Sequence, residues 1–145
     1  MRSKRFEPIQ QIASTSATDL SRVMGEAARR VADLEAQLQQ LTTYRREYLD
    51  QSATERGALD AVRLQNYRSF IDRLGEAVRQ HSIKLDAARG DYDRCRLQWS
   101  AKRIEAQSLG RVIDRFRNEE RHAEEKREQR DGDDAAMRIA LKASV

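Results

Sequence analysis

The stretch that decides the fold is VADLEAQLQQLTTYRREY, residues 31–48, where apolar side chains recur at alternating steps of three and four. The same spacing reaches back to Phe6 and returns over residues 64–123. A repeat of about 3.5 residues holds an apolar seam against a partner helix, as in coiled coils. Between the two seams, residues 51–61 carry polar side chains and a glycine, as a connection between antiparallel helices should. The sequence therefore predicts an all-α fold, a long two-helix antiparallel coiled-coil hairpin.

The hairpin is predicted to form a single coiled-coil domain. Pro8 suits the first turn of helix one. The nearly all-charged run RNEERHAEEKREQRDGDD should fray near Gly132. We therefore expect helix one over about 6–50, the tip over 51–61, helix two over about 62–130 and a disordered tail over 131–145.

The register of the hairpin is predicted from the sizes and charges of facing side chains. Centring the turn on Arg56 and Gly57 sets large residues against small ones, such as Phe6 against Ala106. Beyond Ala106, helix two then overhangs helix one. Its seam residues there, including Phe116, would have no partner in helix one, so we expect another protein to cover them.

Composition narrows the classes of function. Charged residues make up 36% of the 145 residues and the net charge is +4, but both signs are interleaved, so a nucleic-acid partner is not demanded. No apolar run approaches the roughly 20 residues that cross a bilayer, and no signal peptide is recognisable. We therefore expect a cytoplasmic protein without a transmembrane segment.

No constellation of catalytic or metal-ligating residues is visible. Cys95 lies on the predicted seam, where a packed thiol is more common than a redox or metal site. His81 and His122 are far apart in the heptad map, and no glycine-rich phosphate loop occurs. The sequence predicts a protein that is not an enzyme and has no catalytic residues, no metal site and no cofactor.

One edge of the predicted hairpin is unusually apolar near the tip. In an antiparallel pair, the g positions of both helices share one edge and the e positions share the other. The g-edge residues and their seam neighbours form a set that we call the tip patch: Gln37, Leu41, Tyr44, Tyr48, Phe70, Leu74, Ala77 and His81. Exposed patches of this kind usually mark partner contacts. In the alternative interpretation, Tyr44 and Phe70 only shield the seam.

Two segments beside the tip resemble a known family. QLQQLTTYRREY at 37–48 and NYRSFIDRLGEAVRQH at 66–81, followed by Trp99 and Lys102, are similar to the bacterial flagellar export protein family FliJ. The resemblance implies a non-enzymatic stalk and chaperone component of the flagellar type III protein export apparatus, which serves flagellum biogenesis and motility. It also implies a hairpin like the central stalk of rotary ATPases.

The resemblance implies partners as well. Proteins of this family insert into the hexameric ring of the export ATPase FliI, promote its assembly, connect it to the cytoplasmic domain of the gate protein FlhA, and bind escort chaperones. By motif position, the gate-binding surface falls on the tip patch. We expect a monomer at the inner face of the cell membrane at the flagellar base. The uncovered seam and its flanking arginines are the expected ring-binding group: Leu109, Ile113, Phe116, Arg111, Arg115 and Arg117.

Three other functions stay open at this point. One is the equivalent stalk of a virulence type III secretion system, which should lack the two tip segments. Another is a basic coiled-coil scaffold that binds nucleic acid or a membrane surface, whose affinity for DNA should fall steeply with salt. The third is a coiled coil that self-assembles through the uncovered seam.

Overall fold

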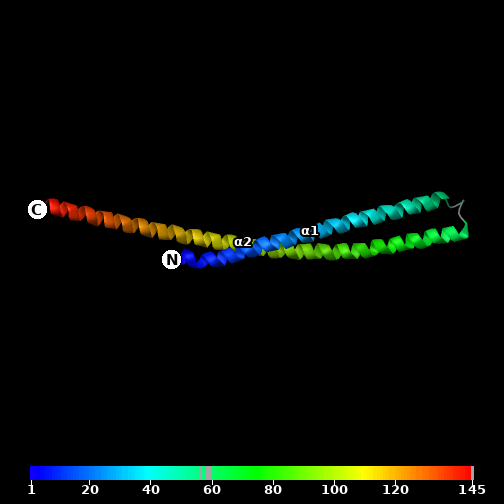
Figure 1. The fold of residues 1–145 in the computed structure, drawn as a ribbon, viewed down its shortest axis with the longest axis horizontal. Helices are drawn as coiled ribbons and strands as arrows, with labels where there is room; N and C mark the ends of the chain where they lie inside the picture. The colour runs from blue at the N-terminus through cyan, green and yellow to red at the C-terminus, as the bar shows by residue number, and fades with distance from the viewer. Residues whose placement is uncertain (56, 58–59, 145) are drawn as a thin grey trace. The chain divides into compact units, whose positions relative to one another are not determined.

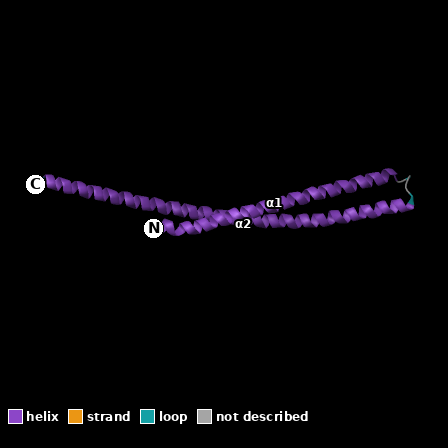
Figure 2. Cartoon of the chain, in the orientation of Figure 1, coloured by secondary structure: helices purple, strands orange, loops and turns teal. Residues whose placement is uncertain are grey.

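The computed structural model describes residues 1–55, 57 and 60–144. It contains two helices, α1 at Arg2–Glu55 and α2 at Ala61–Ala143 (Figure 1). Almost all of the described residues are helical, and none of them belongs to a strand (Figure 2). The predicted all-α fold, a helical hairpin, is confirmed.

The helices start and end differently from the predicted boundaries. α1 begins at Arg2 instead of about residue 6, so Pro8 lies inside the helix, where it removes a backbone hydrogen bond. Packing against α2 holds these first turns, as described below. At the tip, α1 stays helical to Glu55, and α2 begins at Ala61 because the Asp60 carboxylate accepts a hydrogen bond from the Arg63 backbone N–H at 2.8 Å.

The C-terminal part of α2 is also longer than predicted. The helix continues through Gly132 to Ala143, where the sequence indicated a disordered tail over 131–145. One glycine costs a helix only about 1 kcal/mol relative to alanine, and the following residues AAMRIALKA are mostly strong helix formers. Residues 121–144 are all exposed, so this segment of α2 adds nothing to the buried core of the described chain.

The chain divides into two compact units, and one of them contains the tip. This tip unit spans Asp19–Trp99 and joins the C-terminal part of α1 to the N-terminal part of α2. Its core cluster consists of Leu34, Leu85 and Ala88, with Val31 and Leu38 packed against it. At its edge, Arg89 donates to Glu35 Oε1 at 3.1 Å. Both of these residues are e positions, which confirms that the e positions of the two helices share an edge.

The other unit pairs the two ends of the chain. It contains Met1–Thr18 and Ser100–Val145. Glu120 of α2 accepts two hydrogen bonds from Ser3, one from the backbone N–H at 3.1 Å and one from the hydroxyl at 2.7 Å. These bonds satisfy a donor in the first turn of α1, where N–H groups have no partner within the helix. They lower the pKa of Glu120, the hydroxyl contributing most.

Three further contacts support the first turns of α1. The rings of Phe6 and Phe116 lie 5.5 Å apart between centroids, with the Arg2 guanidinium over the Phe116 ring. Beside them, Arg117 donates to Glu7 Oε1 at 2.6 Å. These contacts explain why α1 is helical ahead of Pro8.

The core of both units is shallow. No large side chain among the residues that the structure describes is fully buried. The buried apolar residues are Ala13, Leu34, Ile71, Leu85, Ala88 and Ile113. A two-helix seam can cover each side chain from only one direction, so partial burial is the expected result.

The register of the pair differs from the predicted one by roughly one heptad. Phe6 packs against Phe116, whereas Ala106 was the predicted partner. The predicted turn centre took Gly57 as its midpoint, but the Asp60 cap and the long α1 move the turn toward α2. Arg56, the other half of the predicted centre, lies outside the described residues.

Candidate functional site

The candidate site is an aromatic cluster within the tip patch. Tyr48 lies at its centre, with ring centroids at 4.6 Å from Phe70, 5.4 Å from Tyr44 and 6.1 Å from Tyr67. The rings are tilted by 34° to 54°, an arrangement that favours edge-to-face attraction. Tyr44 is 47% exposed and Phe70 is 36% exposed. The cluster therefore presents aromatic surface to solvent on a packed base.

Helical spacing places the four rings together. Tyr44 and Tyr48 are one turn apart on α1, and Tyr67 and Phe70 are one turn apart on α2, so each pair lies on one side of its helix. Tyr48 occupies a seam position and reaches across to both rings of α2. The cluster is thus a property of the pairing of the helices and not of either helix alone.

Tyr67 belongs to this cluster although the sequence did not place it in the tip patch. Its hydroxyl donates to Glu55 Oε2 at 3.3 Å. Partial burial, followed by the neighbouring Glu55 charge, raises the pKa of Tyr67, so the phenol stays protonated as a donor. The signal for Tyr67 was its seam position near Phe70, but a turn centred on Arg56 and Gly57 would place it opposite Arg45, away from Tyr48.

The rest of the tip patch surrounds the rings on the same unit. Leu41, Leu74, Ala77 and His81 are half-buried, and Gln37 is exposed. His81 Nδ1 donates to the Ala77 carbonyl oxygen at 3.1 Å, which fixes the imidazole along α2. Tyr44 of α1 and Phe70 of α2 are connected through Tyr48, whose ring contacts both.

Arg45 faces Gly75, on the edge away from the rings. A Cβ atom at position 75 would lie 3.3 Å from Arg45 Nε, so the glycine makes room for the guanidinium. Arg45 Nε is buried and has no hydrogen-bond partner among the described residues. A turn centred on Arg56 and Gly57 would have set Arg45 opposite Tyr67, where the guanidinium could lie on the ring. In the structure Tyr67 contacts Tyr48 and Arg45 lies beside Gly75, so that pairing is wrong.

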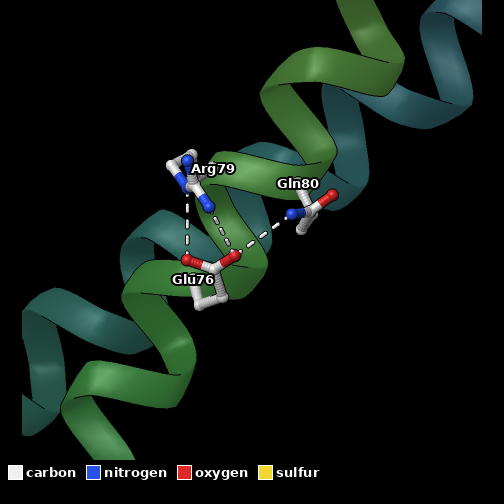
Figure 3. Close-up of polar contacts among 3 residues, drawn as sticks. All are labelled: Glu76, Arg79 and Gln80. Carbon is white, nitrogen blue, oxygen red and sulfur yellow. Dashed lines mark hydrogen bonds and ion pairs between the residues drawn. The ribbon is translucent and has the colours of Figure 1, made fainter.

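On the outer face of α2, beside the tip patch, the Glu76 carboxylate is bound by the side chains of Arg79 and Gln80 (Figure 3). Glu76 accepts two hydrogen bonds from Arg79, at 2.8 and 3.1 Å, and one from Gln80 at 3.1 Å. The bonds from Arg79, and then that from Gln80, lower the pKa of Glu76. The same pairing raises the pKa of Arg79.

The seam that was predicted to be uncovered is covered by α1. Ile113 is only 4% exposed, Phe116 packs against Phe6, and Leu109 is half-buried. With the shifted register, α1 reaches these residues, which removes both the reason for a covering partner and the seam proposed for self-assembly. Among the predicted ring-binding residues, only the arginines are exposed: Arg111, Arg115 and Arg117, the last paired with Glu7.

The described residues contain neither a candidate metal site nor a candidate membrane span. They include no group of three or more histidine, cysteine or acidic side chains that could hold a metal ion. In the same part of the chain, neither helix has an apolar stretch long enough to cross a membrane. Cys95 is a half-buried free thiol.

Comparison with known proteins gives a consistent family. A family model described as flagellar FliJ protein matches residues 2–144. A flagellar FliJ protein of Salmonella typhi is 28% identical over 138 residues, covering 94% of each chain. Its counterpart from Escherichia coli K12 is 27% identical over 135 residues, covering 92% of each chain. No solved structure matches the chain.

Proposed function

Because the chain belongs to the FliJ family, we propose that it is a non-enzymatic linker that joins the export ATPase ring to the membrane export gate. Family membership makes it a flagellar protein associated with export. In the proposed role, it promotes assembly of the FliI ring, contacts the cytoplasmic domain of FlhA, and receives escort chaperones. It would act in the cytoplasm, at the inner face of the membrane at the flagellar base.

The observation that carries the proposal is the aromatic cluster of the tip patch. Tyr44 and Phe70 are exposed, while Tyr48 holds both from below. Rigid aromatic side chains are over-represented among residues that dominate binding energy, because they add large contact area at little entropic cost. We assign the gate contact to this surface.

The contact with the export ATPase ring is assigned to the other unit, which contains Met1–Thr18 and Ser100–Val145. Since α1 covers the apolar residues of the predicted group, the proposal keeps the exposed Arg111 and Arg115 and adds the exposed segment 121–144 of α2. An unpaired helix with alternating charges offers many side chains to a partner that surrounds it. The two proposed contacts then lie in different units, so they can be lost separately.

The gate contact is tested by replacing the exposed aromatic side chains. We expect Tyr44→Ala with Phe70→Ala to weaken binding to the purified FlhA cytoplasmic domain by at least ~30-fold, the loss expected for two hot-spot residues. Binding to the FliI ring should be unchanged. Calorimetry or surface-based binding measures both affinities, and circular dichroism confirms the helical fold.

A matched control shortens two exposed apolar side chains elsewhere in the same unit. Ile83→Ala with Leu97→Ala truncates two exposed aliphatic side chains on the outer face of α2. This variant should bind the gate domain like the wild type. If the folded aromatic variant keeps its affinity, the tip patch is not the gate-binding surface.

A further inference from the structure

The side of α2 next to the aromatic cluster carries only positive charge. Residues at steps of three and four from 63 to 84 form one stripe along this side, and the stripe has three basic members and no acidic one. The stripe consists of Arg63, Asn66, Phe70, Arg73, Ala77, Gln80 and Lys84. Arg63, Arg73 and Lys84 are exposed, and none takes part in an ion pair within the described part of the chain.

None of the carboxylates of α2 near the stripe pairs with its cations: Asp72 forms no ion pair among the described residues, and the others bind other groups. Glu76 is held by Arg79 and Gln80 on the outer face (Figure 3). Asp60 caps the start of α2, and Asp91 pairs with Arg94. The three cations of the stripe therefore remain available to a partner.

The α1 side of the same cluster carries negative charge instead of positive charge. Between Gln37 and Gln51, the stripe that contains Tyr44 has a single charged residue, Glu47. Tyr44 and Glu47 line a common shallow groove together with Gln40. Glu47 is exposed and forms no ion pair among the residues described. The rings are thus bordered by three positive charges along α2 and one negative charge along α1.

We propose that the tip patch recognises a protein surface with an apolar hollow for the rings and carboxylates along the side that meets α2. The inference rests on the proposed function, because it describes the chemistry of the partner at the same patch. Charges at the border of an interface accelerate association and select one orientation, while the buried aromatic contacts supply most of the affinity. Arg73 and Lys84 are the orienting residues. A polyanion such as DNA or an anionic bilayer fits less well, because Glu47 would face it across the rings.

The test reverses charge at the α2 border and compares it with the opposite edge. The test variant is Arg73→Glu with Lys84→Glu. The control is Arg46→Glu with Arg68→Glu, which changes the same number of exposed, unpaired arginine or lysine charges away from the g edge. The probe is the purified cytoplasmic domain of the export gate protein, with association rates measured by stopped flow.

At low ionic strength we expect the test variant to associate at least ~10-fold more slowly than the wild type, and the control to stay within ~2-fold. At high salt the difference should shrink to less than ~3-fold, because salt screens exposed charges. Thermal unfolding should be the same for all three proteins, since the altered side chains are exposed.

The outcomes separate this inference from the proposed function. If Tyr44→Ala with Phe70→Ala abolishes binding but the test variant associates like the wild type at both salt concentrations, the charged border has no role and the inference is overturned. An equal slowing of the test and control variants would also overturn it, because only net charge would matter. So would binding of duplex DNA or anionic vesicles that is lost in the test variant while gate binding is kept. Wild-type affinity of the aromatic variant would instead refute the proposed function at this surface.

Discussion

The contact between Phe6 and Phe116 decides the register of the two helices, and a double-mutant cycle can measure it. The ring centroids are 5.5 Å apart with a tilt of 37°, within the range in which aromatic pairs attract by about 0.5–1.5 kcal/mol beyond their burial. In the register predicted from sequence, Phe6 would face Ala106 and would have no coupling to Phe116. The coupling energy therefore distinguishes the two registers.

The expected energies follow from burial. Truncating a fully buried phenylalanine to alanine costs about 3–5 kcal/mol. Phe6 and Phe116 are half-buried, so we expect each single variant to lose about 2–3 kcal/mol of the free energy of unfolding in its unit. Because the second truncation no longer removes the ring contact, the double variant should lose about 1 kcal/mol less than the sum of the two.

Urea unfolding followed by far-UV circular dichroism gives the free energies, and amide hydrogen exchange reports the stability of residues 1–18 directly. Ile12→Ala is the matched control, because Ile12 is 68% exposed in the same segment of α1. It should change stability by no more than about 0.5 kcal/mol. A coupling energy of zero between Phe6 and Phe116, with both single variants destabilised, would refute this register.

Two further predictions address glycine packing and pH. Gly25→Ala should stabilise the chain by about 1 kcal/mol through helix propensity, since no side chain lies within 4 Å of the new Cβ. Gly75→Ala should gain less because Arg45 must move, and equal shifts in the urea midpoint would show that Arg45 moves freely. The lowered pKa of Glu120 means that its hydrogen bonds with Ser3 stabilise the fold above the ordinary glutamate pKa, and that this contribution is lost as the pH falls through the folded-state pKa. The urea midpoint of Glu120→Gln should therefore lie below that of the wild type at neutral pH and approach it in acid, whereas a difference independent of pH would contradict this role of Glu120.

The fold class was readable from the sequence because the 3.5-residue repeat constrains every seam position in the same way. The register was not, since sliding one helix by a heptad keeps the seam intact and changes only which side chains face each other. Large-against-small matching favoured Phe6 with Ala106, but the structure pairs two large rings at Phe6 and Phe116. The position of the helix cap at Asp60 was the local signal that would have corrected the turn.

The candidate site was less sensitive to the register than the expected ring-binding group. Tyr44, Tyr48 and Phe70 belong to the seam and the g edge, and both edges keep their identity when the helices slide by whole heptads. By contrast, an overhang depends directly on where the pairing ends, so its prediction for Phe116 failed together with the register. Tyr67 was missed for the same reason.

The shallow core has a thermodynamic consequence. Unfolding a two-helix seam with no fully buried large side chain among its described residues exposes little apolar surface for each residue. The heat-capacity increment of unfolding grows with that surface, so it should be small for a chain of this length. A small increment flattens the stability curve. The free energy of unfolding should then change gently with temperature, and thermal transitions should be broad and cold denaturation remote.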